Sequence, residues 1–109
     1  MFDACFGSKT GQEEVFEDTK MLIQSAMDGF NVCIFAYGQT GSGKTYTVTG
    51  PSDKMDGIVP RSFNEMFEIK QRMEKDGHYQ VKFECYMVEL YLDKILDLLT
   101  SGQKKNGST

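Results

Sequence analysis

The sequence predicts an α/β fold in which helices flank a central, mostly parallel sheet. Segments with strand-like and helix-like patterns alternate along the 109 residues, which is typical of a layered α/β architecture. The strongest strand signal is residues 32–37, an unbroken apolar run that suits a central strand covered on both faces. A glycine-rich loop and a helix pattern follow this run directly. These observations predict a sheet edge where a loop joins a buried strand to a helix.

The composition is close to that of an average soluble domain, with 39% apolar residues, 26% charged residues and a net charge of −4. Disorder is not expected, because 12% of the residues are aromatic. The longest apolar run is far shorter than the roughly 20 residues that cross a bilayer, and no secretory signal is visible. The acidic balance argues against a nucleic-acid partner. The widely spaced cysteines are expected to be reduced and buried in an intracellular protein; they are Cys5, Cys33 and Cys85.

The first helix is expected over about residues 10–28, after a short strand end at residues 1–6. Thr10 and Glu13 fit a capping box at its start, and Gly29 follows its end. The apolar residues of this segment fall on one helical face, which predicts that they pack against the sheet. They are Val15, Phe16, Leu22, Ile23, Ala26 and Met27.

After the glycine-rich loop, a second helix is predicted over residues 44–49 and is interrupted by a loop at residues 50–57. Helical character returns near Pro60 and ends near residues 76–77. The pattern then predicts a long strand over residues 79–91 and a short helix over residues 93–99. The polar, glycine-rich residues 100–109 are expected to be a loop or a truncated end.

The glycine-rich loop carries a motif with a chemical meaning. It matches the phosphate-binding pattern G-x-x-x-x-G-K-[ST] in full and consists of Gly38, Gln39, Thr40, Gly41, Ser42, Gly43, Lys44 and Thr45. Glycines let backbone N–H groups approach phosphate oxygens, and the following helix directs its positive dipole end at them. Lys44 would supply a charge to the β- and γ-phosphates, and the Thr45 hydroxyl would coordinate Mg²⁺. The alternative is a flexible turn, which has no reason to carry Lys44 and Thr45.

A nucleotide hydrolase also needs an acid that holds the metal through water. Glu89 is the one superficially suitable residue, but apolar residues continue past it, so it lies inside the predicted strand rather than at its mouth. A structural, hydrogen-bonding role is the alternative for Glu89. No N-K-x-D occurs, so nothing argues for guanine selectivity. The sequence therefore shows part of an active site, and no catalytic residue is assigned within it.

Several segments resemble the motor domains of the kinesin family. Residues 37–47, YGQTGSGKTYT, resemble the family's nucleotide loop, and residues 57–61, GIVPR, resemble its "G-I-I-P-R". Residues 86–91, YMVELY, together with residues 97–99, DLL, resemble its "S-Y-x-E-I-Y-x-E-x-x-x-D-L-L", although the usual "N-E" is absent near residues 92–93. The ordered match covers about residues 2–99 and is most similar to the minus-end-directed, C-terminal-motor subfamily.

The resemblance implies part of a microtubule motor that binds and hydrolyses ATP with Mg²⁺ in the cytoplasm. It makes residues 38–45 the phosphate loop, and it places Tyr46 where a side chain packs on the adenine ring. Residues 1–109 then form a partial motor domain, without the first strand and the two switch segments. Contacts with tubulin, and a coiled coil that makes the parent dimeric, would lie elsewhere. The alternatives are another P-loop ATPase or kinase, or a non-catalytic nucleotide-binding fragment, and the 109 residues alone are expected to be inactive.

Overall fold

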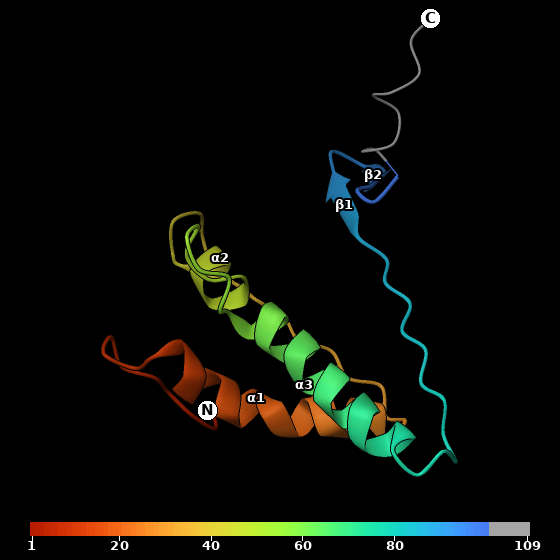
Figure 1. The fold of residues 1–109 in the computed structure, drawn as a ribbon. Helices are drawn as coiled ribbons and strands as arrows, with labels where there is room; N and C mark the ends of the chain where they lie inside the picture. Colours follow the sequence, from red (N-terminus) through yellow and green to blue (C-terminus); the bar gives the residue numbers. More distant parts are fainter. Residues whose placement is uncertain (101–109) are drawn as a thin grey trace, which may run out of the picture.

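The computed structural model describes residues 1–100, which form three helices and a two-stranded sheet. The elements are α1 (Gln12–Met27), α2 (Lys44–Val48), α3 (Ile58–Glu74), β1 (Val88–Tyr91) and β2 (Lys94–Asp97). In Figure 1, α1 and α3 lie against each other, and an extended segment leads from the end of α3 to the distant β1–β2 pair. The Cα radius of gyration is 17.2 Å, whereas a compact domain of this length has one of about 13 Å. The chain is therefore an open arrangement. Among residues 1–100, no helix is long and apolar enough to cross a membrane.

The core lies where α1 packs on α3. Phe16 and Ile23 of α1 are buried together with Ile69 of α3, and the Lys20 ammonium pairs with the Glu65 carboxylate at 3.4 Å across the same interface. Phe16 and Ile23 are seven residues apart in the sequence, which puts them on one helical face. The first helix is thus confirmed, and α3, not a sheet, covers Phe16 and Ile23 of its predicted apolar face. Leu22 and Ala26 of that face are exposed.

The start of α1 differs from the predicted capping box. The N-cap residue is Gly11, and no side chain caps the helix. The Thr10 N–H instead donates to the Gly7 carbonyl at 3.0 Å, which closes a turn before the helix begins. Because the N-cap is Gly11 rather than Thr10, Thr10 does not stand at the position from which its hydroxyl could accept a hydrogen bond from the first turn.

The predicted helix over residues 93–99 is wrong, because this segment is the second strand of a hairpin. β1 pairs with β2 in antiparallel register, with Val88 opposite Asp97 and Tyr91 opposite Lys94. Leu92 and Asp93 connect the strands with φ angles of 46° and 57°. Two successive positive φ angles are the signature of a two-residue type I′ turn, whose twist matches that of the strands.

The end of the hairpin is closed by Asp97. Its Oδ1 accepts the Leu99 N–H at 2.9 Å and the Thr100 N–H at 3.2 Å. Hydrogen bonds from the Thr100 side chain and backbone, followed by the Leu99 N–H, hold the pKa of Asp97 below its ordinary value. This local capping by a carboxylate turns the chain after β2.

The apolar run at residues 32–37 is extended but belongs to no sheet, and of the predicted strand at residues 79–91 only Val88–Tyr91 is in a ladder. Residues 1–6 are also not a strand. A strand requires a neighbour with which to exchange backbone hydrogen bonds, and within residues 1–100 these segments have none. The central parallel sheet is therefore not assembled by the described residues, and side chains expected to be buried, such as Phe35 at 87% exposure, face solvent. The expectation of buried cysteines is likewise wrong, since Cys5, Cys33 and Cys85 are exposed.

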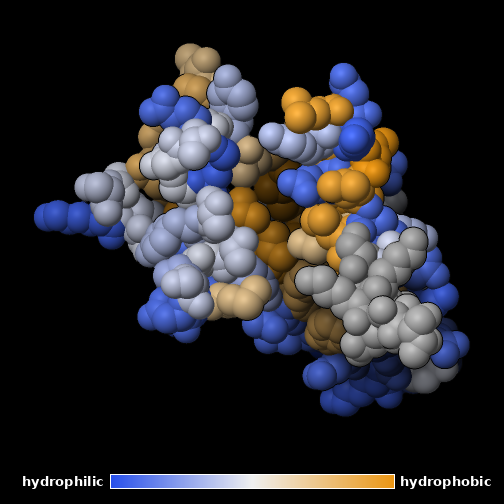
Figure 2. Space-filling model, turned by 90° about the horizontal axis from the view of Figure 1, so that it is seen from above, coloured by the Kyte–Doolittle hydropathy of each residue, from blue (hydrophilic) through white to orange (hydrophobic). Residues whose placement is uncertain are grey.

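An apolar hollow remains beside this run. Figure 2 shows hydrophobic side chains gathered in a depression of the surface. A cavity of about 450 Å³ separates residues 34–36 from α2 and α3, and it is lined by Ile23, Ile34, Phe35, Ala36, Thr47, Val48, Ile58, Val59, Ser62, Phe63 and Met66. The face that a covered central strand would bury thus stays open.

The loop between α2 and α3 is closed at its base. The Gly57 N–H donates to the Thr49 carbonyl at 3.1 Å, and a Cβ at Gly57 would come within 2.6 Å of the Val48 carbonyl. The Arg61 Nε donates to the Asp56 carbonyl at 2.7 Å, which ties the loop to the first turn of α3. The end of α2 and the start of α3 are therefore held together independently of the loop's tip.

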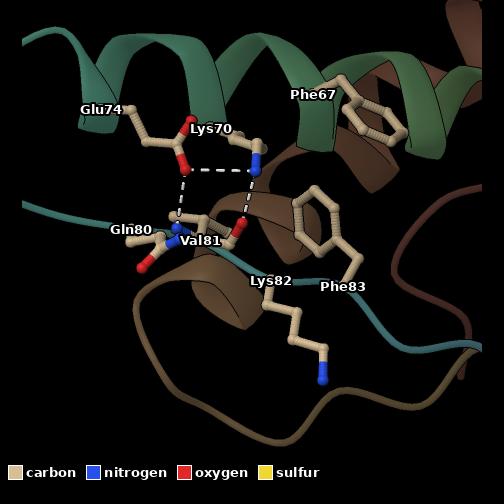
Figure 3. A pocket seen from close by; sticks show the side chains of 7 residues that line it. All are labelled: Phe67, Lys70, Glu74, Gln80, Val81, Lys82 and Phe83. Atoms are coloured by element: carbon tan, nitrogen blue, oxygen red, sulfur yellow. Dashed lines mark hydrogen bonds and ion pairs between the residues drawn. The ribbon is translucent and has the colours of Figure 1, made fainter.

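The other end of α3 is fastened to the extended segment that follows it (Figure 3). The Glu74 carboxylate accepts the Val81 N–H at 2.8 Å, and the Lys70 ammonium donates to the Val81 carbonyl and pairs with Glu74 at 3.1 Å. The Phe67 and Phe83 rings meet edge to face with centroids 5.2 Å apart. We call Lys70, Glu74 and Val81 the α3 clasp. The Val81 N–H, followed by Lys70, holds the pKa of Glu74 below its ordinary value.

Candidate functional site

The glycine-rich loop turns the chain from the extended residues 31–37 into α2. The Ser42 N–H donates to the Gln39 carbonyl at 3.1 Å, and the Thr47 N–H donates to the Gly43 carbonyl at 3.0 Å in the first helical bond. Gly41 and Gly43 have φ angles of 81° and 95°, in the left-handed region that residues with a Cβ rarely adopt. The loop therefore needs glycine at both positions.

Gly38 allows a close approach within the loop. A Cβ at this position would lie 2.5 Å from the Ser42 hydroxyl oxygen and 3.3 Å from the Ser42 Cβ. Any larger residue would push Ser42 outward and widen the loop. The tight curvature of residues 38–43 thus depends on the first glycine of the motif as well as on those with positive φ.

The Lys44 side chain folds back over the loop. Its ammonium donates to the carbonyls of Gly38 and Gln39, the latter at 2.8 Å, and the residue is half-buried. The positive charge is therefore held at the loop rather than in free solvent. A positive charge held beside a glycine-rich loop suits an anionic, phosphate-like ligand.

A cavity of about 470 Å³ opens beside the loop, and it is lined by Thr40, Gly41, Gly43, Lys44, Thr45 and Tyr46. Thr45 and Tyr46 are exposed, and Tyr46 has 57% of its surface accessible. The structure thus brings most of the predicted site residues to one concave surface. The carbonyls of Gly38 and Gln39 accept hydrogen bonds from the Lys44 ammonium. A hydroxyl, an ammonium and glycine backbone form a donor set that fits a polyphosphate with its magnesium ion.

No acid completes this cavity among the described residues. The side chains that line it include no carboxylate. Within residues 1–100, no three His, Cys, Asp or Glu side chains come close enough together to hold a metal ion. Glu89 is exposed in β1 opposite Leu96 and is not among the lining residues. The chain therefore carries groups suited to binding, whereas a group that activates water is not among the residues that line the cavity.

One contact at the site was not predicted from the sequence. The Gln12 side-chain Nε2, at the start of α1, donates to the Tyr46 carbonyl in α2 at 2.5 Å. The same carbonyl accepts the Gly50 N–H at 3.0 Å. Gln12 and Tyr46 are 34 residues apart, and no motif or periodicity in the sequence links them.

An extended apolar segment, a glycine-rich loop and a helix that begins with Lys44 and Thr45 make up the P-loop arrangement of α/β nucleotide-binding proteins. The family model described as "Kinesin motor domain" matches residues 1–109. The chain therefore belongs to the kinesin motor domain family.

Individual relatives agree with this assignment. The chain is 55% identical over 100 residues to "Kinesin-like protein KIN-14I" of Oryza sativa subsp. japonica, covering 91% of this chain and 8% of that protein. It is 44% identical over 107 residues to "Kinesin-like protein KIFC1" of Homo sapiens, covering 95% of this chain and 16% of that protein. The chain thus spans less than a fifth of the length of these relatives.

A solved structure shares the fold. It is described as "Crystal structures of mutants reveal a signalling pathway for activation of the kinesin motor ATPase" and superposes with a TM-score of 0.73 at 37% identity. The match covers 91% of this chain and 31% of that one. The α/β P-loop fold class is thereby confirmed, although the described residues supply only a part of it.

Proposed function

We propose that this chain forms the phosphate-binding side of the ATP site of a microtubule motor. Residues 38–45 cradle the triphosphate with backbone N–H groups, and the Lys44 ammonium neutralises the β- and γ-phosphates. Tyr46 packs its ring on the adenine, for which an exposed aromatic at the edge of the cavity is suited. The position of Lys44, folded over a loop that needs glycine at two left-handed positions, is the observation that carries this proposal.

The Thr45 hydroxyl holds Mg²⁺ in this proposal. Thr45 is exposed and lines the cavity next to Lys44, so its oxygen is free to face a bound triphosphate. When bound, the metal ion neutralises charge that develops on the β- and γ-phosphate oxygens. With no carboxylate on the cavity wall, Thr45 is the lining residue best suited to this role.

The activity proposed for the full-length gene product is ATP hydrolysis coupled to movement on microtubules in the cytoplasm. It is supported by family membership along the whole chain. A C-terminal position of the motor is supported by "Carboxy-terminal kinesin 2" of Xenopus laevis, which is 45% identical over 107 residues. Tubulin contacts, minus-end direction and dimerisation through a coiled coil are assigned to the gene product as a whole and not to residues 1–100.

A second candidate function is nucleotide binding without hydrolysis by the site that the described residues form. The observation behind it is the cavity wall, which offers the Lys44 ammonium and the hydroxyls of Thr40, Thr45 and Tyr46 but no acid. Hydrolysis requires groups that orient the attacking water and hold the metal through water. We assign those groups to parts of the gene product outside the described residues.

The test is ATP binding and ATPase activity of the full-length gene product, with and without microtubules. Lys44→Ala should abolish both activities, whereas Lys9→Ala, a change at an exposed lysine outside the loop, should leave them unchanged. ATPase activity that microtubules do not stimulate would favour another P-loop hydrolase. Unchanged ATP binding in Lys44→Ala would refute the assignment of the loop.

A further inference from the structure

We infer that Gln12, the first residue of α1, is a positioning residue for the nucleotide site, because its side chain fixes the backbone of Tyr46. The inference rests on the proposed nucleotide binding. The Gln12 Nε2 donates to the Tyr46 carbonyl at 2.5 Å, and Tyr46 directly follows Lys44 and Thr45 in α2. A residue on a different helix thereby holds the part of α2 that carries Tyr46.

α2 requires such support because it has five residues. A single helical turn is unfavourable by itself, since few hydrogen bonds offset the ordering of its backbone. Its last carbonyls also have no partner within the helix. The Tyr46 carbonyl obtains two donors from outside α2, the Gly50 N–H at 3.0 Å and the Gln12 amide. Of these two, Gln12 comes from a separate and longer helix.

α1 is a suitable anchor because it is packed on α3. Phe16, one turn after Gln12, is buried together with Ile69 of α3. Gln12 itself is half-buried, and its hydrogen bond to Tyr46 is exposed. The Gln12 amide therefore connects the first turn of α1 to α2.

The contact lies at one end of the site. Lys44 and the glycine loop are fixed by their own hydrogen bonds, from the Lys44 ammonium to Gln39 at 2.8 Å and from the Ser42 N–H to Gln39 at 3.1 Å. Gln12 instead binds the backbone of Tyr46, whose ring is proposed to pack on the adenine. Loss of the Gln12 donor should therefore weaken recognition of the nucleoside and leave recognition of the polyphosphate intact.

The experiment compares binding of ATP and of inorganic tripolyphosphate to the full-length gene product. Gln12→Met removes the donor and keeps the length of the side chain. It should weaken ATP binding about two- to fivefold, as expected for one neutral, solvent-accessible hydrogen bond, with tripolyphosphate binding unchanged. Gln12→Lys restores a donor and should recover ATP affinity. Gln24→Met is the matched control, because the Gln24 amide bonds to Asp28 at 3.0 Å at the far end of the same helix.

Each outcome decides the inference. Equal ATP affinity in Gln12→Met and the wild type overturns it, as does an equal loss for both ligands or a lowered melting temperature with unchanged ATP affinity. A loss of ATP affinity in Gln24→Met that matches that in Gln12→Met overturns it as well. If Lys44→Ala leaves ATP binding unchanged, the proposed function itself fails. The failure of the positioning role and the failure of the site are thereby distinguished.

Discussion

The Glu74 carboxylate accepts the backbone N–H of Val81 at 2.8 Å, seven residues further along the chain. The Lys70 ammonium donates a hydrogen bond to the Val81 carbonyl. Both backbone groups of Val81 are thus satisfied by side chains of α3, so this residue needs no neighbouring strand at that point. The α3 clasp defines where the chain leaves the helix and in which direction it continues toward β1.

The first prediction concerns the strength of the clasp. Glu74→Met in the full-length gene product should speed amide hydrogen exchange at Val81 several-fold, because the N–H loses a charged acceptor. The measurement is residue-resolved hydrogen exchange. Glu68→Met on the same helix is the control, since Glu68 is exposed and its carboxylate forms no ion pair or hydrogen bond within residues 1–100. Unchanged exchange at Val81 in Glu74→Met would show that the clasp does not hold this segment.

The second prediction is the pH dependence of the same contact. The pKa of Glu74 is lowered, chiefly by the Val81 N–H and then by Lys70, from an ordinary value of 4.5. The stabilisation is therefore fully present above the unfolded-state pKa and is lost as the pH falls through the lower folded-state pKa. In the full-length gene product, the difference in melting temperature between wild type and Glu74→Met should be constant from about pH 7 to about pH 5. This difference should shrink below that range. A difference that already shrinks near neutral pH would contradict this assignment.

The third prediction tests the left-handed glycine at the start of α2. Gly43 has a φ of 95°, and a Cβ there would meet no atom within 4 Å, so Gly43→Ala introduces backbone strain without a clash. The strain should cost about 1 kcal/mol and lower ATP affinity roughly fivefold. Isothermal titration with ATP measures the effect. Gly7→Ala, which also meets open space but has no left-handed φ, should bind ATP as the wild type does.

The fourth prediction concerns the turn of the hairpin. Leu92 has a φ of 46°, a conformation that asparagine adopts at lower cost than leucine. Leu92→Asn should stabilise the β1–β2 hairpin by about 0.5–1 kcal/mol and raise the melting temperature of the full-length gene product. Leu98→Asn, a similar change at an exposed leucine outside the turn, serves as the control. A lower melting temperature in Leu92→Asn than in Leu98→Asn would argue against the type I′ turn.

The fifth prediction concerns the 109 residues in isolation. Phe16, Ile23 and Ile69 are the buried hydrophobic residues of the described chain, while many large apolar side chains are exposed. So small a core cannot offset the entropy of ordering the backbone. The isolated chain should bind a hydrophobic dye, aggregate and show no cooperative thermal transition. A reversible, cooperative melt would refute this expectation.

Local patterns predicted the three helices that the described residues form, although they also predicted a helix at residues 93–99 where a strand lies. The apolar spacing that includes Phe16 and Ile23 indicated α1, and Pro60 with the apolar residues after it indicated α3, because helical hydrogen bonds form within one segment. The glycine-rich loop could also be predicted from the sequence, since its glycines are required by the backbone angles that the loop adopts.

The sheet could not be predicted in the same way, because a strand needs hydrogen-bonding partners from other segments of the chain. The apolar run at residues 32–37 has the pattern of a buried strand, yet no described segment pairs with it. Residues 93–99 have apolar residues that fit a short helix, but Leu92 and Asp93 form a turn that returns the chain along β1. The Gln12–Tyr46 contact depends on how two helices meet, which no local pattern encodes.

The closed base of the loop between α2 and α3 has a practical consequence. The Gly57 N–H donates to the Thr49 carbonyl at 3.1 Å, and Asp56 is tied to Arg61 of α3, so only the loop residues 51–55 have a length that is decoupled from the helices on either side. The tip around Ser52 and Asp53 is exposed. An epitope or a fluorescent reporter inserted there would label the molecule beside its phosphate loop while leaving the anchoring of both helices untouched.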